Sequence, residues 1–596
     1  MDKDLPNNFL ERLKRHTIFR IAAIYAVAAW ILIQLSSSVL PNMGLPKDSV
    51  RFVIIVVGLG FPVMLILAWT FVKPTSIEPE GYTRWKHWRV RLGSLLSIII
   101  IVLVGTSGWY LWRAAVIAHV AKAISETAPV KTASVFNPLP NSIAVLPFRN
   151  QSNDHGQQYF SDGFTEEITS ALGALPDMHV ISWQSASMYR GKQVSANAVG
   201  KALNVANILT GSIRRDGDRV RISAELVNAV TGYQLWSAHY DRTFKDIFSV
   251  QDEISKAMAN ALQLHLPDDH PLVSTATANA DAHDFYLRGL ADAVTSTAAS
   301  LNLAIGNYQQ AIRLDPKYAE AYAGLAQAYA ASHLYTNIPL TKSLPLAKRA
   351  ARQALRLNPK LAAAHKVMGM VYALEQKPRR AMKELHHAIE LDPNNAVARI
   401  IYATLLPSSK YKEAQDQYRI AVSLDPNNAF AHYNLGVNYE THGDYKNAMT
   451  EYQATLGLAP QLVFARFDLA NLYHRNGDDN SAVAILTGVT SDDPFQTQLL
   501  NAARLIYMAQ ENQELGTQAL AALKQIDENK ASATDKAVLV DLYILAGQND
   551  HALQLLSEVC ANAPETCADI AIDPSYTALH DKPAFQELVK KYKLKI

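Results

Sequence analysis

The residues of this chain that could do chemistry are few and scattered. Asp162, Glu166 and Glu167 lie close together, a spacing at which two carboxyl groups could share acid–base work. The same residues fall at the start of a predicted helix, whose dipole favours negative charge in its first turn, so a structural role explains them as well. The 18 histidines form no His-Glu-x-x-His pattern, and the adjacent His386 and His387 point in different directions on a helix. We therefore expect no metal site, no cofactor and no catalytic residue.

Two further groups of side chains could react or bind. Cys560 and Cys567 are the only cysteines of the chain. In an oxidising compartment they could form a disulfide that closes a small loop, since two cysteines alone cannot complete a four-ligand structural zinc site. Two reduced thiols at a helix end are the alternative. Four arginines surround a predicted hairpin turn: Arg214, Arg215, Arg219 and Arg221. They could bind an anionic partner, or they could simply be solvated charges at the tip of the hairpin.

The second half of the chain is organised by a short phrase that ends in proline. From Pro359 to Pro494 the phrases follow one another at intervals of 34, 33, 34 and 34 residues. A period held this closely predicts an all-α solenoid of stacked units, each with an apolar face that only its neighbour can cover. The longer interval from Pro316 to Pro359 predicts an inserted loop over residues 334–345. The phrases are Leu314-Asp315-Pro316, Leu357-Asn358-Pro359, Leu391-Asp392-Pro393, Leu424-Asp425-Pro426, Leu458-Ala459-Pro460 and Asp492-Asp493-Pro494.

Within each period, small and apolar residues recur at helical spacing around a turn that glycine marks. This pattern resembles the tetratricopeptide repeat, so we assign a repeat array to residues 281–564 and a C-terminal helical cap to residues 565–596. In one unit the matching positions are Tyr433, Leu435, Gly436, Tyr439, Gly443, Ala448, Tyr452 and Pro460.

The resemblance implies that the first helix of each unit lines a concave face. Aromatic side chains beside amides on that face suit an extended peptide or a partner helix, because apolar anchors then have hydrogen-bond partners nearby. Packing between neighbouring units explains most of these aromatics equally well. The candidate groove residues are Phe430, Tyr433, Asn434, Val437, Phe464, Phe467, Asn471 and His474.

The first part of the chain predicts three membrane-spanning helices, at about residues 21–40, 52–72 and 92–112. The second and third segments contain no charged residue and are long enough to cross a hydrocarbon core of ~30 Å at ~1.5 Å per residue. A cleaved signal peptide is the alternative for the first segment. Basic residues cluster in residues 1–20 and between the second and third segments, which predicts a cytoplasmic N-terminus. Residues after about 112, starting with a linker over residues 113–140, would then be periplasmic.

Residues 141–268 predict a separate mixed α/β sandwich, with helices on one face of a sheet. Two alternating segments, 208–215 and 219–228, flank Asp216-Gly217-Asp218, which is a strong hairpin signal. The segment resembles the TolB amino-terminal-like domain, which in bacterial membrane proteins often precedes tetratricopeptide arrays. The phrases that carry this resemblance are Ser142-Ile-Ala-Val-Leu-Pro-Phe148, Phe160-Ser-Asp-Gly-Phe-Thr-Glu-Glu167, Leu209-Thr-Gly-Ser-Ile213 and Leu235-Trp236.

Together these features predict a multidomain inner-membrane scaffold for envelope assembly or signalling, which binds proteins or peptides through the repeat groove and could form a homo-oligomer. A formal net charge of +2 argues against a nucleic-acid partner. The alternative is a transmembrane sensor whose outer domain binds a ligand and controls a cytoplasmic cyclase or transcription regulator. An enzyme is disfavoured, because no nucleophile–base pair is evident in residues 142–264.

Overall fold

The computed structural model describes residues 136–594 with short gaps, and only Tyr25, Ala29, Trp30 and Gln34 before them. Apart from these four residues of the first segment, the predicted membrane spans at 21–40, 52–72 and 92–112 therefore lie outside the described residues. No helix within the described part is long and apolar enough to cross a membrane. The chain divides into two compact units, 1–127 and 128–596, and every element below belongs to the second. The gaps are 153, 176, 265–275, 295–296, 337, 488, 490–492, 510–511, 563–566, 568–573 and 593.

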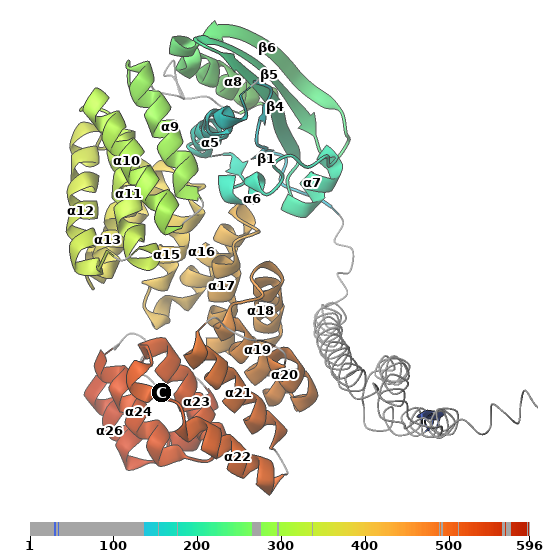
Figure 1. The fold of residues 1–596 in the computed structure, drawn as a ribbon, viewed down its shortest axis with the longest axis vertical. Helices are drawn as coiled ribbons and strands as arrows, with labels where there is room; N and C mark the ends of the chain where they lie inside the picture. The colour runs from blue at the N-terminus through green and yellow to red at the C-terminus, as the bar shows by residue number, and fades with distance from the viewer. Residues whose placement is uncertain are drawn as a thin grey trace, which may run out of the picture. The chain divides into compact units, whose positions relative to one another are not determined.

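The α/β domain contains one mixed sheet in the order β3-β1-β4-β5-β6, with β2 paired to β4 (Figure 1). The strands β1, β2 and β3 join it in parallel pairs, whereas β4, β5 and β6 form an antiparallel meander, and the hairpin predicted around Asp216-Gly217-Asp218 is confirmed. The β4–β5 turn needs Gly217, whose φ is +59°. The elements are β1 (Ser142–Val145), β2 (Arg149–Asn150), α5 (Gln158–Gly173), β3 (His179–Val180), α6 (Trp183–Ser187), α7 (Ala196–Leu203), β4 (Asn207–Asp216), β5 (Arg219–Asn228), β6 (Gln234–Thr243) and α8 (Ile247–Ala261).

Helices cover both faces of this sheet, so the prediction of helices on one face only was wrong. Ile143 and Val145 of β1 point into a core formed with α5 and α8, whereas Ala144 between them points into a smaller core with α7. All four residues of β1 are buried. A strand that is apolar on both sides gives no alternating pattern, and the sequence alone therefore did not reveal the second layer.

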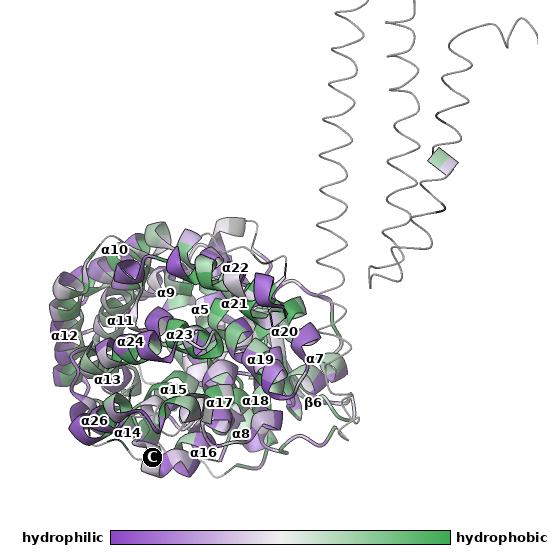
Figure 2. Ribbon diagram, turned by 90° about the horizontal axis from the view of Figure 1, so that it is seen from below, coloured by the Kyte–Doolittle hydropathy of each residue, from purple (hydrophilic) through white to green (hydrophobic). Residues whose placement is uncertain are grey.

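Among the described residues, the helices from α9 to α24 form eight antiparallel pairs, which we call repeats 1 to 8. First helices of successive repeats touch one another, as α11 and α13 or α21 and α23 do, so they run parallel. Figure 2 shows the second helices α10, α12 and α14 at the rim and the first helices α11, α13 and α15 nearer the centre. The pairs are α9 (Ala280–Val294) and α10 (Ala298–Leu314), α11 (Ala319–Tyr335) and α12 (Leu340–Leu357), α13 (Ala362–Leu374) and α14 (Pro378–Leu391), α15 (Ala396–Thr404) and α16 (Tyr411–Leu424), α17 (Ala429–Thr441) and α18 (Tyr445–Leu458), α19 (Val463–Arg475) and α20 (Asp479–Leu486), α21 (Pro494–Met508) and α22 (Gln513–Lys524), α23 (Ala533–Leu545) and α24 (Asn549–Asn562).

The structure bears on two predictions for the array, namely the inserted loop and the C-terminal helical cap. The inserted loop predicted over residues 334–345 is wrong, because α11 continues to Tyr335 and α12 begins at Leu340 with Pro345 inside it. Pro345 is the sixth residue of α12, so its missing backbone donor removes one intrahelical hydrogen bond while the helix still begins at Leu340. After repeat 8 the chain ends in a short 3-10 helix, Pro574–Leu579, and α26, Pro583–Tyr592.

Candidate functional site

Small residues let the two helices of each repeat approach closely, and this approach orients the first helix. A Cβ added to Gly436 of α17 would lie 2.7 Å from the ring of Tyr452 in α18. The turn between these helices places Gly443 at a φ of +80°, where glycine is favoured. The same geometry recurs along the array. Residues that follow the proline before each first helix by the same number of positions therefore occupy equivalent positions on the first helices.

The fourth residue after each proline shows how the array changes along its length. In repeats 4 and 5 this residue is Val397 and Phe430, whose side chains are 39% and 63% exposed. In repeat 6 it is Phe464, which is half-buried, and in repeat 2 it is Glu320. Two exposed apolar side chains thus stand at neighbouring equivalent positions on α15 and α17.

The seventh residue after each proline is buried more deeply. Tyr433 of repeat 5 packs 5.8 Å from the ring of Tyr452, and burial together with Asp468 raises the pKa of its phenol well above the ordinary value. Phe467 of repeat 6 is only 5% exposed. Of the candidate groove residues, Phe430 therefore lies on the surface, whereas Phe467 lies in the core between repeats.

The other candidate groove residues make local contacts. Asn434 donates from Nδ2 to the carbonyl of Phe430 at 2.7 Å, which keeps its amide on its own helix. His474 pairs with Asp479 through Nδ1 at 2.6 Å. Val437 and Asn471 are half-buried on α17 and α19. The structure thus keeps these four on first helices, as the repeat pattern predicts.

Helix α5 of the α/β domain covers the first helices of repeats 1 to 3, a contact that sequence reasoning missed. Near its start, a Cβ added to Gly163 would lie 2.6 Å from Cδ2 of Leu287 in α9. At its end, the carbonyl of Gly173 accepts a hydrogen bond of 2.8 Å from Nδ2 of Asn394, in the loop before α15. Figure 1 shows α5 beside α9. The first three repeats are therefore occupied by a segment of their own chain.

Two largely buried carboxyl groups, Glu166 and Glu167, lie at the centre of this contact. Burial raises the pKa of Glu166 to about 7 despite the opposing charge of Lys366, and burial raises the pKa of Glu167 to about 8. Glu167 accepts a hydrogen bond of 2.5 Å from Gln251 and lies 3.5 Å from His283. Burial lowers the pKa of His283 to about 3, so its imidazole is neutral and forms no ion pair with Glu167.

The expectation that the helix dipole explains these carboxyl groups is wrong for all three, and most clearly for Glu166 and Glu167. Helix α5 begins at Gln158, so both residues lie in its middle turns, and its first turn contains no acidic residue. Asp162, by contrast, pairs with Arg190 at 3.0 Å. Glu166 and Glu167 face the repeats. No pattern within residues 141–268 could have indicated this position.

The rim of the α5 contact is closed by charged side chains. Arg215 of β4 donates to Asp284 of α9 at 2.6 Å, and its guanidinium lies 4.0 Å from the ring centroid of Phe244. Tyr159 donates to the same carboxylate at 2.8 Å. Arg219 pairs with Asp241 at 2.7 Å on the surface of the sheet. Of the four arginines of the hairpin, Arg215, Arg219 and Arg221 are thus paired within the chain, whereas Arg214 is exposed.

Two copies of one motif hold the other end of the α/β domain. The motif Asp-Pro-Asn-Asn stands at 392–395 and again at 425–428, before α15 and α17. Asn394 also donates to the carbonyl of Met178 at 2.9 Å and accepts from the amide of Val180 at 2.9 Å. Asp425 accepts from Ser182 and Ser185 at 2.5 and 2.6 Å. The duplicated motif was visible in the sequence, but nothing there showed what it would bind.

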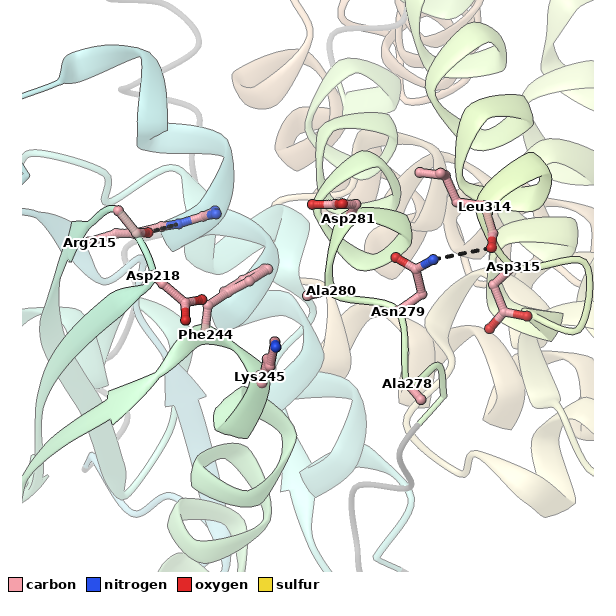
Figure 3. A pocket seen from close by; sticks show the side chains of 11 residues that line it. Arg215, Asp218, Phe244, Lys245, Ala278, Asn279, Ala280, Asp281, Leu314 and Asp315 are labelled. Atoms are coloured by element: carbon pink, nitrogen blue, oxygen red, sulfur yellow. Dashed lines mark hydrogen bonds between the residues drawn. The ribbon is translucent and has the colours of Figure 1, made fainter.

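A cavity of about 810 Å³ lies between the β4–β5 hairpin and the beginning of repeat 1. Figure 3 shows Arg215, Asp218, Phe244 and Lys245 on one side and the residues around Asn279 on the other. Asn279 donates to the carbonyl of Leu314 at 3.2 Å and accepts from the amide of Ala282. The cavity is open and lined by charges of both signs, as is typical of a solvent-filled space where two parts of a fold meet.

The structure also shows where the cysteines and histidines singled out in the sequence lie. Cys560 and Cys567 are buried and joined in a disulfide, with their Cα atoms 4.9 Å apart. Over the residues that the structure describes, no group of three or more His, Cys, Asp or Glu side chains could hold a metal ion. His386 and His387 are exposed on α14 beside Glu390.

Comparison with known families supports the repeat assignment. The family described as "TPR repeat" matches residues 300–332, and the family described as "Tetratricopeptide repeat" matches residues 405–463. The first match covers most of α10 and α11, and the second covers α16, α17 and α18. The chain contains tetratricopeptide repeats. These repeats form the larger part of the described residues, and the α/β domain packs against them.

Similarity to individual proteins is more limited. "Putative adenylate cyclase 3" of Rhizobium meliloti (strain 1021) is 36% identical over 191 residues, which are 32% of this chain and 32% of that protein. The chain thus spans about a third of the length of this curated relative. The solved TPR protein YrrB is 25% identical, with 31% of this chain and 90% of that chain covered and a TM-score of 0.23. The solved pilF of Pseudomonas aeruginosa is 21% identical, with 37% and 95% covered and a TM-score of 0.30.

Proposed function

We propose that this protein is a TPR scaffold that binds another protein through repeats 4 to 6 and is anchored in a bacterial inner membrane. The observation that carries the binding site is the exposure of Phe430 and Val397 at equivalent positions of adjacent repeats. Large apolar side chains held in a row on rigid helices suit a partner helix or an extended peptide. The corresponding side of repeats 1 to 3 is covered by α5, so a partner is directed to the later repeats.

Site-specific photocrosslinking in cells tests this proposal. A photoreactive phenylalanine analogue at position 430 should give one dominant crosslinked protein. The matched control is the same analogue at Leu303, an equally exposed apolar residue, at 59%, on the second helix α10. Equal crosslinking from both positions, or none from position 430, would contradict a binding site on repeats 4 to 6.

The membrane part of the proposal rests on the uncharged segments at 52–72 and 92–112 and on the resemblance of residues 141–268 to the TolB amino-terminal-like domain. The distribution of basic residues favours a cytoplasmic N-terminus, and with it periplasmic repeats. A reporter that is active only in the periplasm should work when it is fused after Asn141 and remain silent after Lys86. The reverse pattern would overturn this topology.

A second candidate function is a sensor that controls a cytoplasmic nucleotide cyclase. One observation favours it, namely the 36% identity that part of this chain shares with a protein named as an adenylate cyclase. In this version the α/β domain and repeats receive a signal and a separate chain performs the reaction. A cyclase recovered from crosslinked membranes would favour the sensor, whereas a periplasmic protein recovered at position 430 would favour the scaffold.

A further inference from the structure

The charges of the repeats are distributed unevenly along the array. Residues 300–428 contain 17 Lys and Arg against 9 Asp and Glu, whereas residues 429–550 contain 7 against 15. The two segments thus have formal charges of +8 and −8, although the whole chain is nearly neutral. Charge of one sign gathered on one part of a surface attracts a surface of the opposite sign.

Much of this difference lies on one edge of the solenoid. The first helices run parallel, so the turns that lead from first to second helices all lie on the same side, which we call the turn edge. In repeats 3 and 4 its exposed cations are Lys377, Arg379, Arg380, Lys410 and Lys412, accompanied by Glu375 and Glu413. In repeats 5 to 8 its acidic residues are Asp444, Asp478, Asp479, Glu514 and Asp550, accompanied by Lys446 and Arg475.

Helix stability explains the acidic part of the turn edge but not the basic part. Asp444 and Asp478 cap α18 and α20, where their carboxylates accept hydrogen bonds from backbone amides. At the equivalent position of α14 stands Lys377, which has no capping bond, and Arg379 and Arg380 follow it in the first turn. The dipole of a helix disfavours cations at this end. Lys377 pairs with Glu375 and Lys410 with Glu413 within their own repeats, each at 2.8 Å, whereas Arg379, Arg380 and Lys412 form no ion pair among the described residues. The presence of these three cations against a local preference points to an interaction outside the repeat.

We propose that the turn edge of repeats 3 and 4 binds the turn edge of repeats 5 and 6 in a second copy of this chain. Because both charges lie on the same edge, a two-fold axis near the junction of repeats 4 and 5 brings each basic part opposite an acidic part. Such an arrangement is closed, with the same two contacts made twice. A parallel arrangement would instead place like charges opposite each other. Exposed ion pairs contribute little individually, so the dimer is weak and sensitive to salt.

Carbodiimide crosslinking, which joins lysine to nearby carboxylate, tests the arrangement directly. Full-length protein in detergent is mixed as equal parts of isotopically light and heavy chains, so that peptides with mixed labels report contacts between copies. We expect mixed-label crosslinks from Lys410 and Lys412 to Asp444, and from Lys377 to Asp478. They should disappear at about 1 M NaCl, where the screening length is about 3 Å.

Charge reversal supplies the decisive comparison. The triple variant K377E/R379E/K412E should lower the dimer fraction at least tenfold, and so should D444K/D478K. Mixing the two variants should restore the dimer, because both contacts then pair opposite charges again. The matched control R352E/R356E/K360E makes the same change of net charge away from the turn edge and should leave the dimer intact.

Loss of a helix cap could unfold the second variant, so D444N/D478N, which retains a capping side chain, is measured beside it and should also weaken the dimer. An unchanged dimer in K377E/R379E/K412E would overturn the proposal. A failure of the two folded reversal variants to recover on mixing would overturn it as well. Phosphatidylglycerol vesicles that bind the wild-type basic edge while the chain stays monomeric at every salt concentration would show that the edge serves a membrane instead.

Discussion

Repeats 1 to 3 and repeats 4 to 6 have the same helical design but differ in what covers their first helices. The first three repeats are covered by α5, and they carry polar residues such as Glu320 and Lys366 at positions where later repeats carry Phe430 and Tyr433. The later repeats leave Val397 and Phe430 exposed. The comparison teaches that one end of a repeat array can be covered by another segment of the same chain, while the other end keeps an apolar surface for a separate partner.

The largest expected effect distinguishes core from surface within the later repeats. Phe467→Ala should lower the free energy of unfolding by about 3 to 5 kcal/mol, because this buried ring leaves a cavity between repeats. Phe430→Ala should change it by less than about 0.5 kcal/mol, since the ring is 63% exposed. Urea unfolding of the two variants measures both values. Equal losses would mean that the two rings have the same role.

The next effect concerns pH and the filled part of the array. Folding raises the pKa of Glu166 to about 7 and of Glu167 to about 8 from an ordinary value of 4.5, so the folded state binds more protons than the unfolded state between these values. The contribution of this pair to stability should therefore be fully present below pH 4.5 and fall as the pH rises toward 8. Each glutamate should account for a loss on the order of 3 kcal/mol between pH 5 and pH 8, because one pKa unit corresponds to about 1.4 kcal/mol.

The double variant E166Q/E167Q removes both ionisations and should flatten this pH dependence. The matched control is Glu225→Gln, an exposed carboxyl on β5, which should leave the pH dependence as it is in the wild type. Thermal unfolding at several pH values compares the three proteins. A double variant that keeps the wild-type slope would show that ionisation of this pair does not destabilise the α5 contact.

A smaller effect is expected where α5 meets repeat 1. Gly163→Val should cost about 1 to 3 kcal/mol, because the new side chain collides with the buried Leu287. Gly306→Val makes the same change on α10, where nothing lies within 4 Å of an added Cβ. Hydrogen exchange should increase in α5 and α9 of the first variant relative to the second. If exchange rises equally in both, the close contact at Gly163 contributes nothing specific.

The smallest effect compares two copies of the Asp-Pro-Asn-Asn motif. Asn394→Ala removes three side-chain hydrogen bonds to the α/β domain and should cost about 1 to 2 kcal/mol. At the equivalent position, Asn427 contributes its backbone amide to Ser185, a bond that alanine retains. Asn427→Ala should therefore change stability by a few tenths of a kcal/mol. Urea unfolding monitored by Trp183, which lies close to this contact, would show whether the two copies differ.

Local patterns predicted most elements of the fold. The interval from Pro359 to Pro494 fixed the repeat period, and Asp216-Gly217-Asp218 located the hairpin, because both depend on residues close in sequence. The contact of α5 with the repeats could not be predicted, since Gly163 and Leu287 are more than a hundred residues apart and neither is unusual by itself. Glu166 and Glu167 were noticed as candidates for chemistry, but only the packing against α9 shows why they matter.

The candidate site was predicted in position but not in detail. Tyr433 and Phe467 are aromatic residues on first helices, as Phe430 and Phe464 are, and from the sequence all four could equally have been groove or core. Which of these rings are exposed and which are buried depends on how neighbouring first helices pack against each other. Exposure is a property of the assembled array, whereas a repeat pattern describes one unit at a time.

Docking of the α/β domain on several repeats at once restricts how this gene can change in length. Repeat arrays commonly gain or lose whole units, because each unit contacts only its neighbours. Here α5 contacts α9 at one end and Asn394 at the other, and Asp425 follows one period later, so a unit added or deleted between them would move a partner out of reach. Units after repeat 5 escape this constraint, and related proteins should therefore vary in repeat number at that end of the array.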